Sequence, residues 1–139
     1  MARKIFVNLP VKDLSKSIEF FTKLGFSFNP QFTDENATCM IISEDSIFAM
    51  LITEPFFKTF TTKEIADASK TAEVITCLSA ENREEVDQIL ANVIAGGGTE
   101  PKPSQDHGWM YIRNFQDLDG HIWEIAYMDE SMIPANPGQ

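Results

Sequence analysis

Hydrophobic residues along this chain occur either in short continuous runs, which are typical of strands, or at helical spacing. The order of these two patterns predicts the secondary structure. Residues 5–9 form a short apolar run that predicts a buried strand, which we expect Pro10 to end. From Leu14 onward the apolar side chains return at helical spacing, with Asp13 placed as an N-cap and Gly25 just beyond the helix. This segment therefore predicts a strand followed by an amphipathic helix.

An extended stretch and a hairpin of two strands are predicted after this helix. Phe side chains within residues 26–32 suggest an extended stretch, which Pro30 interrupts. Residues 37–42 and 47–53 are apolar runs, and the polar residues 43–46 between them have the composition of a turn. The order of this half is therefore strand, helix and then several strands.

The same order returns in the second half of the chain. A buried strand is predicted over residues 74–78 and a helix over residues 81–95, ended by the glycines that follow it. Residues 109–115 and 121–127 predict a second hairpin, joined by a tight turn at residues 117–120. The repeat is about 60 to 70 residues long, longer than the repeats of solenoids. Two copies indicate a pair of related modules, whose strands would curl around a shared cleft.

We therefore predict a single domain with an internal duplication. Module one covers about residues 3–53 and module two about residues 74–128, with a connector over residues 54–73 and a tail over residues 129–139. The connector contains Phe56, Phe57 and Phe60, which either fold back onto the core or form a pocket lid or subunit contact. Its polar residues 62–69 can form a short helix.

Composition restricts the partners of this chain of 139 residues. The chain contains 11 Lys and Arg residues and 21 Asp and Glu residues, which gives a formal net charge of −10. Nucleic acids and anionic membrane surfaces attract basic proteins, so neither is an expected partner. No apolar run has the length of a membrane span or a signal peptide, which predicts a cytoplasmic location. Cys39 and Cys77 lie within apolar runs and are expected to be buried free thiols.

Two motifs carry a resemblance to a known family. Residues 11–26, VKDLSKSIEFFTKLGF, resemble the opening "V-x-D-L-x-x-S-x-x-F-Y-x-x-L-G-F" of the vicinal oxygen chelate superfamily. Residues 117–124, DLDGHIWE, are similar to its closing "D-P-D-G-x-x-W/I-E". This superfamily includes glyoxalase I, bleomycin-resistance proteins and extradiol dioxygenases. The resemblance covers about residues 3–128 and implies an α+β fold, in which two βαβββ modules form a curved, partly open mixed sheet around a cleft. It also implies a homodimer or a closed module pair.

The resemblance further implies four positions for the ligands of one divalent metal. In this sequence they fall on Phe6, Ile75, either Met50 or Leu51, and Glu124. Phe and Ile offer no lone pair, a Met thioether suits soft copper, and one carboxylate cannot hold a catalytic divalent ion. We therefore expect no metal cofactor, and a small organic molecule bound in an apolar cleft.

A metal-dependent enzyme is the alternative. The resemblance suggests a lyase of the lactoylglutathione lyase kind or an extradiol dioxygenase. Such an enzyme would use Glu124, His107 and ligands at other positions of the chain.

The resemblance implies that the four ligand positions point into the cleft, and residues two apart on a strand share their face. The expected ligand-binding lining is Phe6, Asn8, Met50, Ile75, Cys77 and Glu124. Glu124 is the candidate catalytic residue, since an apolar cleft desolvates its carboxylate and suits it to general acid or base chemistry. Alternatively, this carboxylate is paired with a neighbour such as Arg113 or Tyr111.

A second set of candidate ligand-binding residues alternates along the strand at residues 109–115. Trp109, Tyr111 and Arg113 share one face of it and can stack on, or hydrogen-bond to, a flat or anionic ligand. Core packing with a surface Arg explains the same three residues equally well.

Overall fold

The computed structural model describes residues 3–135, which form two compact units divided after Asp67. The boundary falls within the predicted connector. Pro137 and Gly138 of the predicted tail lie outside the described residues, as do Met1 and Ala2. Each unit is described by itself. No helix among residues 3–135 is long and apolar enough to cross a membrane.

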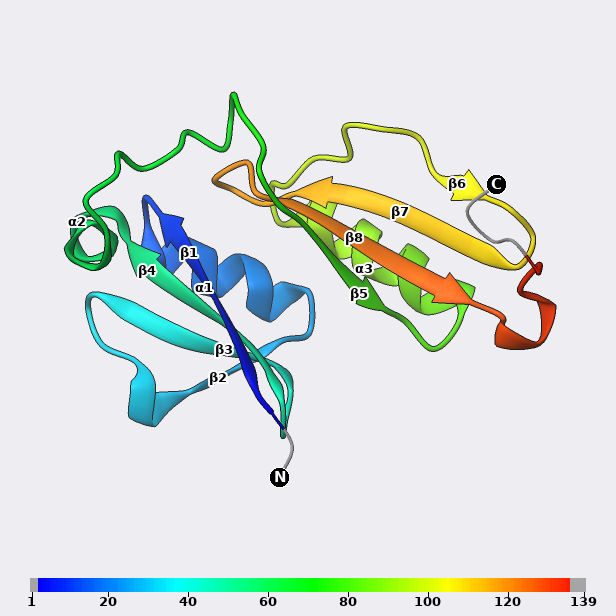
Figure 1. Cartoon of the computed structure of the whole chain (residues 1–139), viewed down its shortest axis with the longest axis horizontal. Helices are drawn as coiled ribbons and strands as arrows, with labels where there is room; N and C mark the ends of the chain where they lie inside the picture. Colours follow the sequence, from blue (N-terminus) through cyan, green and yellow to red (C-terminus); the bar gives the residue numbers. More distant parts are fainter. Residues whose placement is uncertain (1–2, 136–139) are drawn as a thin grey trace. The chain divides into compact units, whose positions relative to one another are not determined.

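The first unit is a four-stranded mixed sheet with one long helix on one face (Figure 1). Its elements are β1 (Ile5–Val11), α1 (Leu14–Lys23), β2 (Ser27–Asn29), β3 (Ala37–Ser43) and β4 (Ile47–Thr53). The strand order is β1-β4-β3-β2, with β1 parallel to β4 and the other pairs antiparallel. Shorter helical turns follow β2 and β4, namely η1 (Pro30–Phe32), α2 (Glu54–Phe57) and η2 (Lys58–Phe60).

The ends of α1 follow from its sequence. The Asp13 side chain accepts a hydrogen bond from the Lys16 backbone N–H at 3.1 Å, as an N-cap does. Gly25 has φ +102°, which lets its N–H donate to the Thr22 carbonyl while the Phe26 N–H donates to that of Phe21. This pair of bonds is a Schellman motif and satisfies the last carbonyls of the helix.

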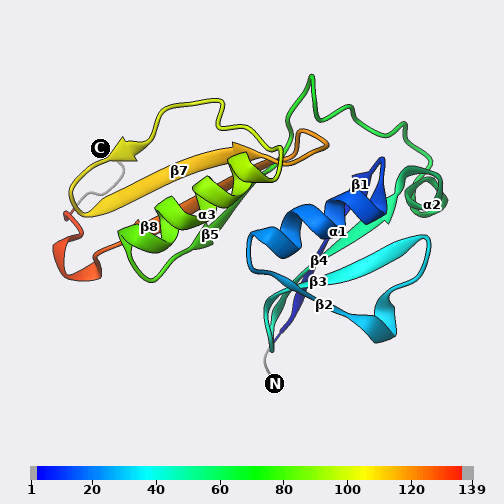
Figure 2. The same ribbon diagram turned by 180° about the vertical axis from the view of Figure 1, so that it is seen from behind.

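The second unit repeats this arrangement. Its elements are β5 (Ile75–Ser79), α3 (Arg83–Ala95), β6 (Gln105–Asp106), β7 (Met110–Gln116), β8 (Ile122–Met128) and η3 (Glu130–Met132). The strand order is β5-β8-β7-β6, with β5 parallel to β8. Figure 2 shows α3 in front of this sheet, on one of its faces. Two βαβββ modules with open mixed sheets confirm the predicted α+β fold.

The capping of the helix ends also repeats in the second unit. Asn82 caps α3 by accepting from the Glu85 backbone N–H. Gly96 has right-handed geometry, and Gly97, with φ +99°, takes the place that Gly25 has in the first unit. The N–H groups of Gly97 and Gly98 donate to the carbonyls of Ile94 and Val93, forming a second Schellman motif.

Several predicted boundaries were wrong, for local reasons. Pro10 lies within β1, an edge strand of its sheet, where a residue without an N–H is tolerated. The connector forms its helical turns at residues 54–60, where Pro55 stands at a helix start, and none at residues 62–69. Both β6 and η3 are short elements that the sequence pattern did not predict.

The strands β1 and β5 are not buried as predicted. Phe6 is 50% exposed and Ile75 is 55% exposed, because each strand has only one neighbour within its own sheet. The prediction for the thiols was half wrong for the same reason. Cys39 on the interior strand β3 is buried, whereas Cys77 on β5 is exposed.

Candidate functional site

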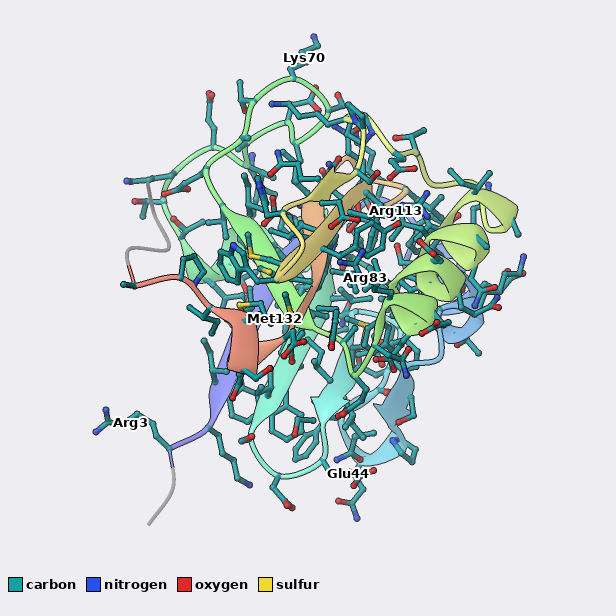
Figure 3. All side chains as sticks on the ribbon, turned by 90° about the vertical axis from the view of Figure 1, so that its right-hand side faces the viewer. Arg3, Glu44, Lys70, Arg83, Arg113 and Met132 are labelled. Atoms are coloured by element: carbon teal, nitrogen blue, oxygen red, sulfur yellow. The ribbon has the colours of Figure 1, made fainter. Side chains whose placement is uncertain are left out.

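The second sheet has two chemically different faces, and hydrogen bonds to α3 identify them. The Tyr111 hydroxyl donates to Asp87 of α3 at 2.6 Å, and Arg113 donates to the same carboxylate at 2.9 Å. Figure 3 shows the Arg83 and Arg113 side chains on the side of α3. Because side chains alternate along β7, Asn114 belongs to the opposite face.

The face opposite α3 carries a polar row across three strands. Cys77 on β5 pairs with Glu124 on β8, and Glu124 pairs with Asn114 on β7, so all three side chains share one face. We call these three residues the polar row. Apolar residues of the same face flank the row, namely Ile75, Ile112, Ile122 and Ala126.

The polar row contains more acceptors than donors. Among the described residues no hydrogen bond or ion pair involves the Glu124 carboxylate, which is half-buried. The Asn114 amide donates from Nδ2 to the Lys102 carbonyl at 3.5 Å, and its buried Oδ1 has no partner. Although Cys77 is exposed as a residue, partial desolvation of its thiol raises the pKa, and the nearby Glu124 charge raises it further. The thiol therefore stays protonated at neutral pH and is a poor nucleophile.

The first sheet has an equivalent row at the same register. Asn8 pairs with Met50 as Cys77 pairs with Glu124, so Met50 rather than Leu51 is the counterpart of Glu124. Phe6 lies on the same face as Asn8 and stacks on Phe48 with ring centroids 4.9 Å apart. The six predicted lining residues thus fall on matching faces of the two sheets, three in each unit. That they line one cleft stays a prediction.

The residues at the four implied ligand positions do not fit a divalent metal. Phe6 and Ile75 have hydrocarbon side chains and Met50 has a thioether, which leaves Glu124 as the one carboxylate. Within residues 3–135, no group of three or more His, Cys, Asp or Glu side chains is placed to hold a metal ion.

The structure does not bring Tyr111 and Arg113 to the face of Glu124. Arg113 forms a two-bond contact with Glu100 at 2.7 and 2.9 Å, besides its bond to Asp87. These bonds raise the pKa of Arg113, and the bond to Asp87 raises that of Tyr111. The Arg113 charge is thus already matched by two acids, and neither residue neutralises Glu124. Tyr111 and Arg113 share a face as predicted, but the alternative that either residue pairs with Glu124 is wrong.

Trp109 and Asn114 complete the comparison with the predicted site. Trp109 precedes β7, and its carbonyl accepts from the Asp129 backbone N–H at 2.8 Å. Asn114 was missed because it belongs to the other parity of the 109–115 strand. The signal that could have found it is the register of the second hairpin, which places it opposite Glu124.

Asp117 of the closing motif is a structural residue of the second hairpin. One carboxylate oxygen accepts from the backbone N–H groups of Asp119 and His121, and the other from the Trp123 indole, each at 3.0 Å. The side chain is buried. The motif therefore holds the turn between β7 and β8 and so sets the register that places Glu124.

An ion pair between the Asp106 carboxylate and Arg83 connects β6 to the start of α3. Asp106 accepts two hydrogen bonds from Arg83 and one from the Gly108 backbone N–H, and these bonds lower its pKa from 3.8 to about 2. We expect Arg83→Gln to raise the Asp106 pKa towards its ordinary value, measured by a carboxyl NMR titration. Lys70→Gln is the control and should leave it unchanged. An unaltered Asp106 titration in the Arg83 variant would contradict this ion pair.

Comparison with known proteins supports the fold of this chain. A family model described as bleomycin resistance protein-like N-terminal matches residues 3–43. No curated protein matches the chain. A hypothetical protein from S. aureus of known structure is 29% identical, with 91% of this chain and 95% of that chain covered and a TM-score of 0.76.

Two more distant structures share the fold. A glyoxalase/bleomycin resistance protein/dioxygenase family enzyme from Burkholderia phytofirmans is 14% identical over 91% of this chain and 99% of its own, with a TM-score of 0.76. A fosfomycin resistance protein from Listeria monocytogenes is 17% identical over 91% and 93%, with a TM-score of 0.64. The N-terminal match and the shared fold confirm the resemblance of this chain to the vicinal oxygen chelate superfamily.

Proposed function

We propose that this chain binds a small organic molecule on the faces of its sheets opposite the helices, without the divalent metal of the superfamily's enzymes. The observation that carries the proposal is the polar row, in which Glu124 and the Asn114 oxygen lack partners amid isoleucine side chains. Ligand sites typically combine an apolar lining with a few polar groups that orient the ligand.

The chemistry of this face limits what it can do to a bound molecule. The raised thiol pKa leaves Cys77 protonated, and an amide such as that of Asn114 does not titrate. Any acid–base step on this face therefore falls to the Glu124 carboxylate. The first sheet contributes Phe6, Asn8 and Met50 to the proposed binding residues, with Asn8 as a polar anchor.

Two measurements test the proposal. After incubation with nickel, zinc, manganese or ferrous iron and desalting, we expect the protein to retain less than about a tenth of an ion per chain, because the donor set is too small. An aromatic fragment library is then screened by protein NMR, with shifts expected at the amides of β5 and β8. Retention of nearly one ion per chain would contradict the metal-free site.

Variants then assign the residues. Glu124→Gln is expected to weaken fragment binding at β5 and β8, and Asn8→Ala to weaken any binding at β1 and β4. Neither variant should lower the melting temperature, because both side chains lie at least partly exposed on strand faces. Glu84→Gln on α3 is the matched control, since it removes the same charge from a different face. Equal affinities in all variants would show that the fragments bind elsewhere.

A further inference from the structure

The polar row shows which kind of ligand head group it can accept. Glu124 is an acceptor-only side chain when ionised. One N–H of the Asn114 amide donates to the Lys102 carbonyl, and the Asn114 oxygen is a second unmatched acceptor. The donors that remain are the second N–H of this amide and the Cys77 thiol, which is a weak donor, so the acceptors of the row outnumber its donors. A ligand that supplies N–H donors would therefore complement the excess of acceptors in this row.

The charge of the second unit favours a cation. Residues 68–139 contain four Lys and Arg against twelve Asp and Glu, a formal net charge of −8 that accounts for most of the −10 of the whole chain. Both arginines of this unit belong to the α3 side, where Arg83 pairs with Asp106 and Arg113 with Asp87 and Glu100. No ion pair reaches Glu124 among the described residues. An anionic ligand would therefore meet an uncompensated carboxylate.

We infer that the ligand of this face carries a cationic N–H group, such as an ammonium or an amidinium, attached to an apolar body. This inference rests on the proposed function and names the class of molecule bound. The cation would donate to Glu124, which turns two unmatched partners into a charge-assisted hydrogen bond. The apolar body would cover the flanking side chains of Ile75, Ile112 and Ile122.

Four aromatic probes of similar size distinguish the effect of ligand charge from the effect of ligand N–H donors. Benzamidine has the cation and the N–H groups, benzyltrimethylammonium has only the cation, benzamide is neutral, and benzoate is anionic. Each is titrated into the whole chain, and dissociation constants are taken from the amide shifts of residues 75–79 and 122–128. We expect benzamidine to bind at least about tenfold more tightly than the other three. We also expect its affinity to fall in about 0.5 M NaCl.

The outcomes distinguish this inference from the proposed function. Glu124→Gln is expected to weaken benzamidine about tenfold, whereas Glu84→Gln, with the same loss of charge, should not. Benzamide or benzoate binding as tightly as benzamidine would overturn the cationic ligand and leave the proposed function standing. Equal binding of benzyltrimethylammonium would overturn the N–H requirement. If no probe shifts these amides, both the inference and the proposed site are wrong.

Discussion

Replacing Gly120 by alanine is expected to destabilise the second unit by about 2–4 kcal/mol, as measured by urea denaturation. Gly120 has φ +91°, a conformation that L side chains rarely adopt. A Cβ at this position would also lie 2.8 Å from the Ala68 carbonyl oxygen and 2.9 Å from Ser69 Cα. These are backbone atoms, which cannot rotate away as a side chain can. Conformational strain and overpacking therefore add in this variant.

Gly108→Ala is the matched control for Gly120→Ala. Gly108 also has a positive φ, +81°, but nothing lies within 4 Å of the position that its Cβ would take. Its substitution should cost only the conformational part, about 1 kcal/mol. A Gly120 variant no less stable than the Gly108 variant would show that the loop at Ala68 moves aside at little cost.

Replacing Asp117 by alanine is expected to cost about 2–4 kcal/mol, because it leaves three hydrogen-bond donors without an acceptor. These donors are two backbone N–H groups of the turn and the indole N–H of Trp123, a side chain only 1% exposed. Trp123→Phe is the control, since it removes one of the three bonds and keeps an aromatic ring parallel to Phe115. The Phe variant should lose clearly less stability. Equal losses would mean that the turn bonds contribute nothing.

The cost of the Asp117 substitution is also expected to depend on pH. Burial raises the pKa of Asp117 above 3.8, and this is only partly opposed by the His121 charge and the Trp123 bond. A raised pKa means that the fold favours the protonated acid, so the contribution of Asp117 is complete below about pH 4 and declines as pH rises through the folded-state pKa. The stability gap between wild type and Asp117→Ala should therefore be larger at about pH 4 than at about pH 8. A gap that widens with pH would contradict this sign.

Local sequence determined the elements of this protein and most of their ends. Asp13 and Gly25 bracket α1 as predicted, because capping depends on residues within a few positions of the helix end. The two hairpins, β3 with β4 and β7 with β8, and the repeated order of strand, helix and hairpin follow from apolar runs and turn residues. The two motifs at residues 11–26 and 117–124 carried the family resemblance, and the fold bears it out.

The tertiary structure decided which face each side chain occupies. Alternation correctly grouped Tyr111 with Arg113, but only the packing of α3 shows that they face Asp87 and away from Glu124. Strand pairing joins residues far apart in sequence, so the row of Glu124 and Asn114 becomes visible only once β7 and β8 are in register. Edge position likewise exposes Cys77 within an apolar run. Periodicity along one strand contains no information about which face a helix will cover or which strand will lie alongside.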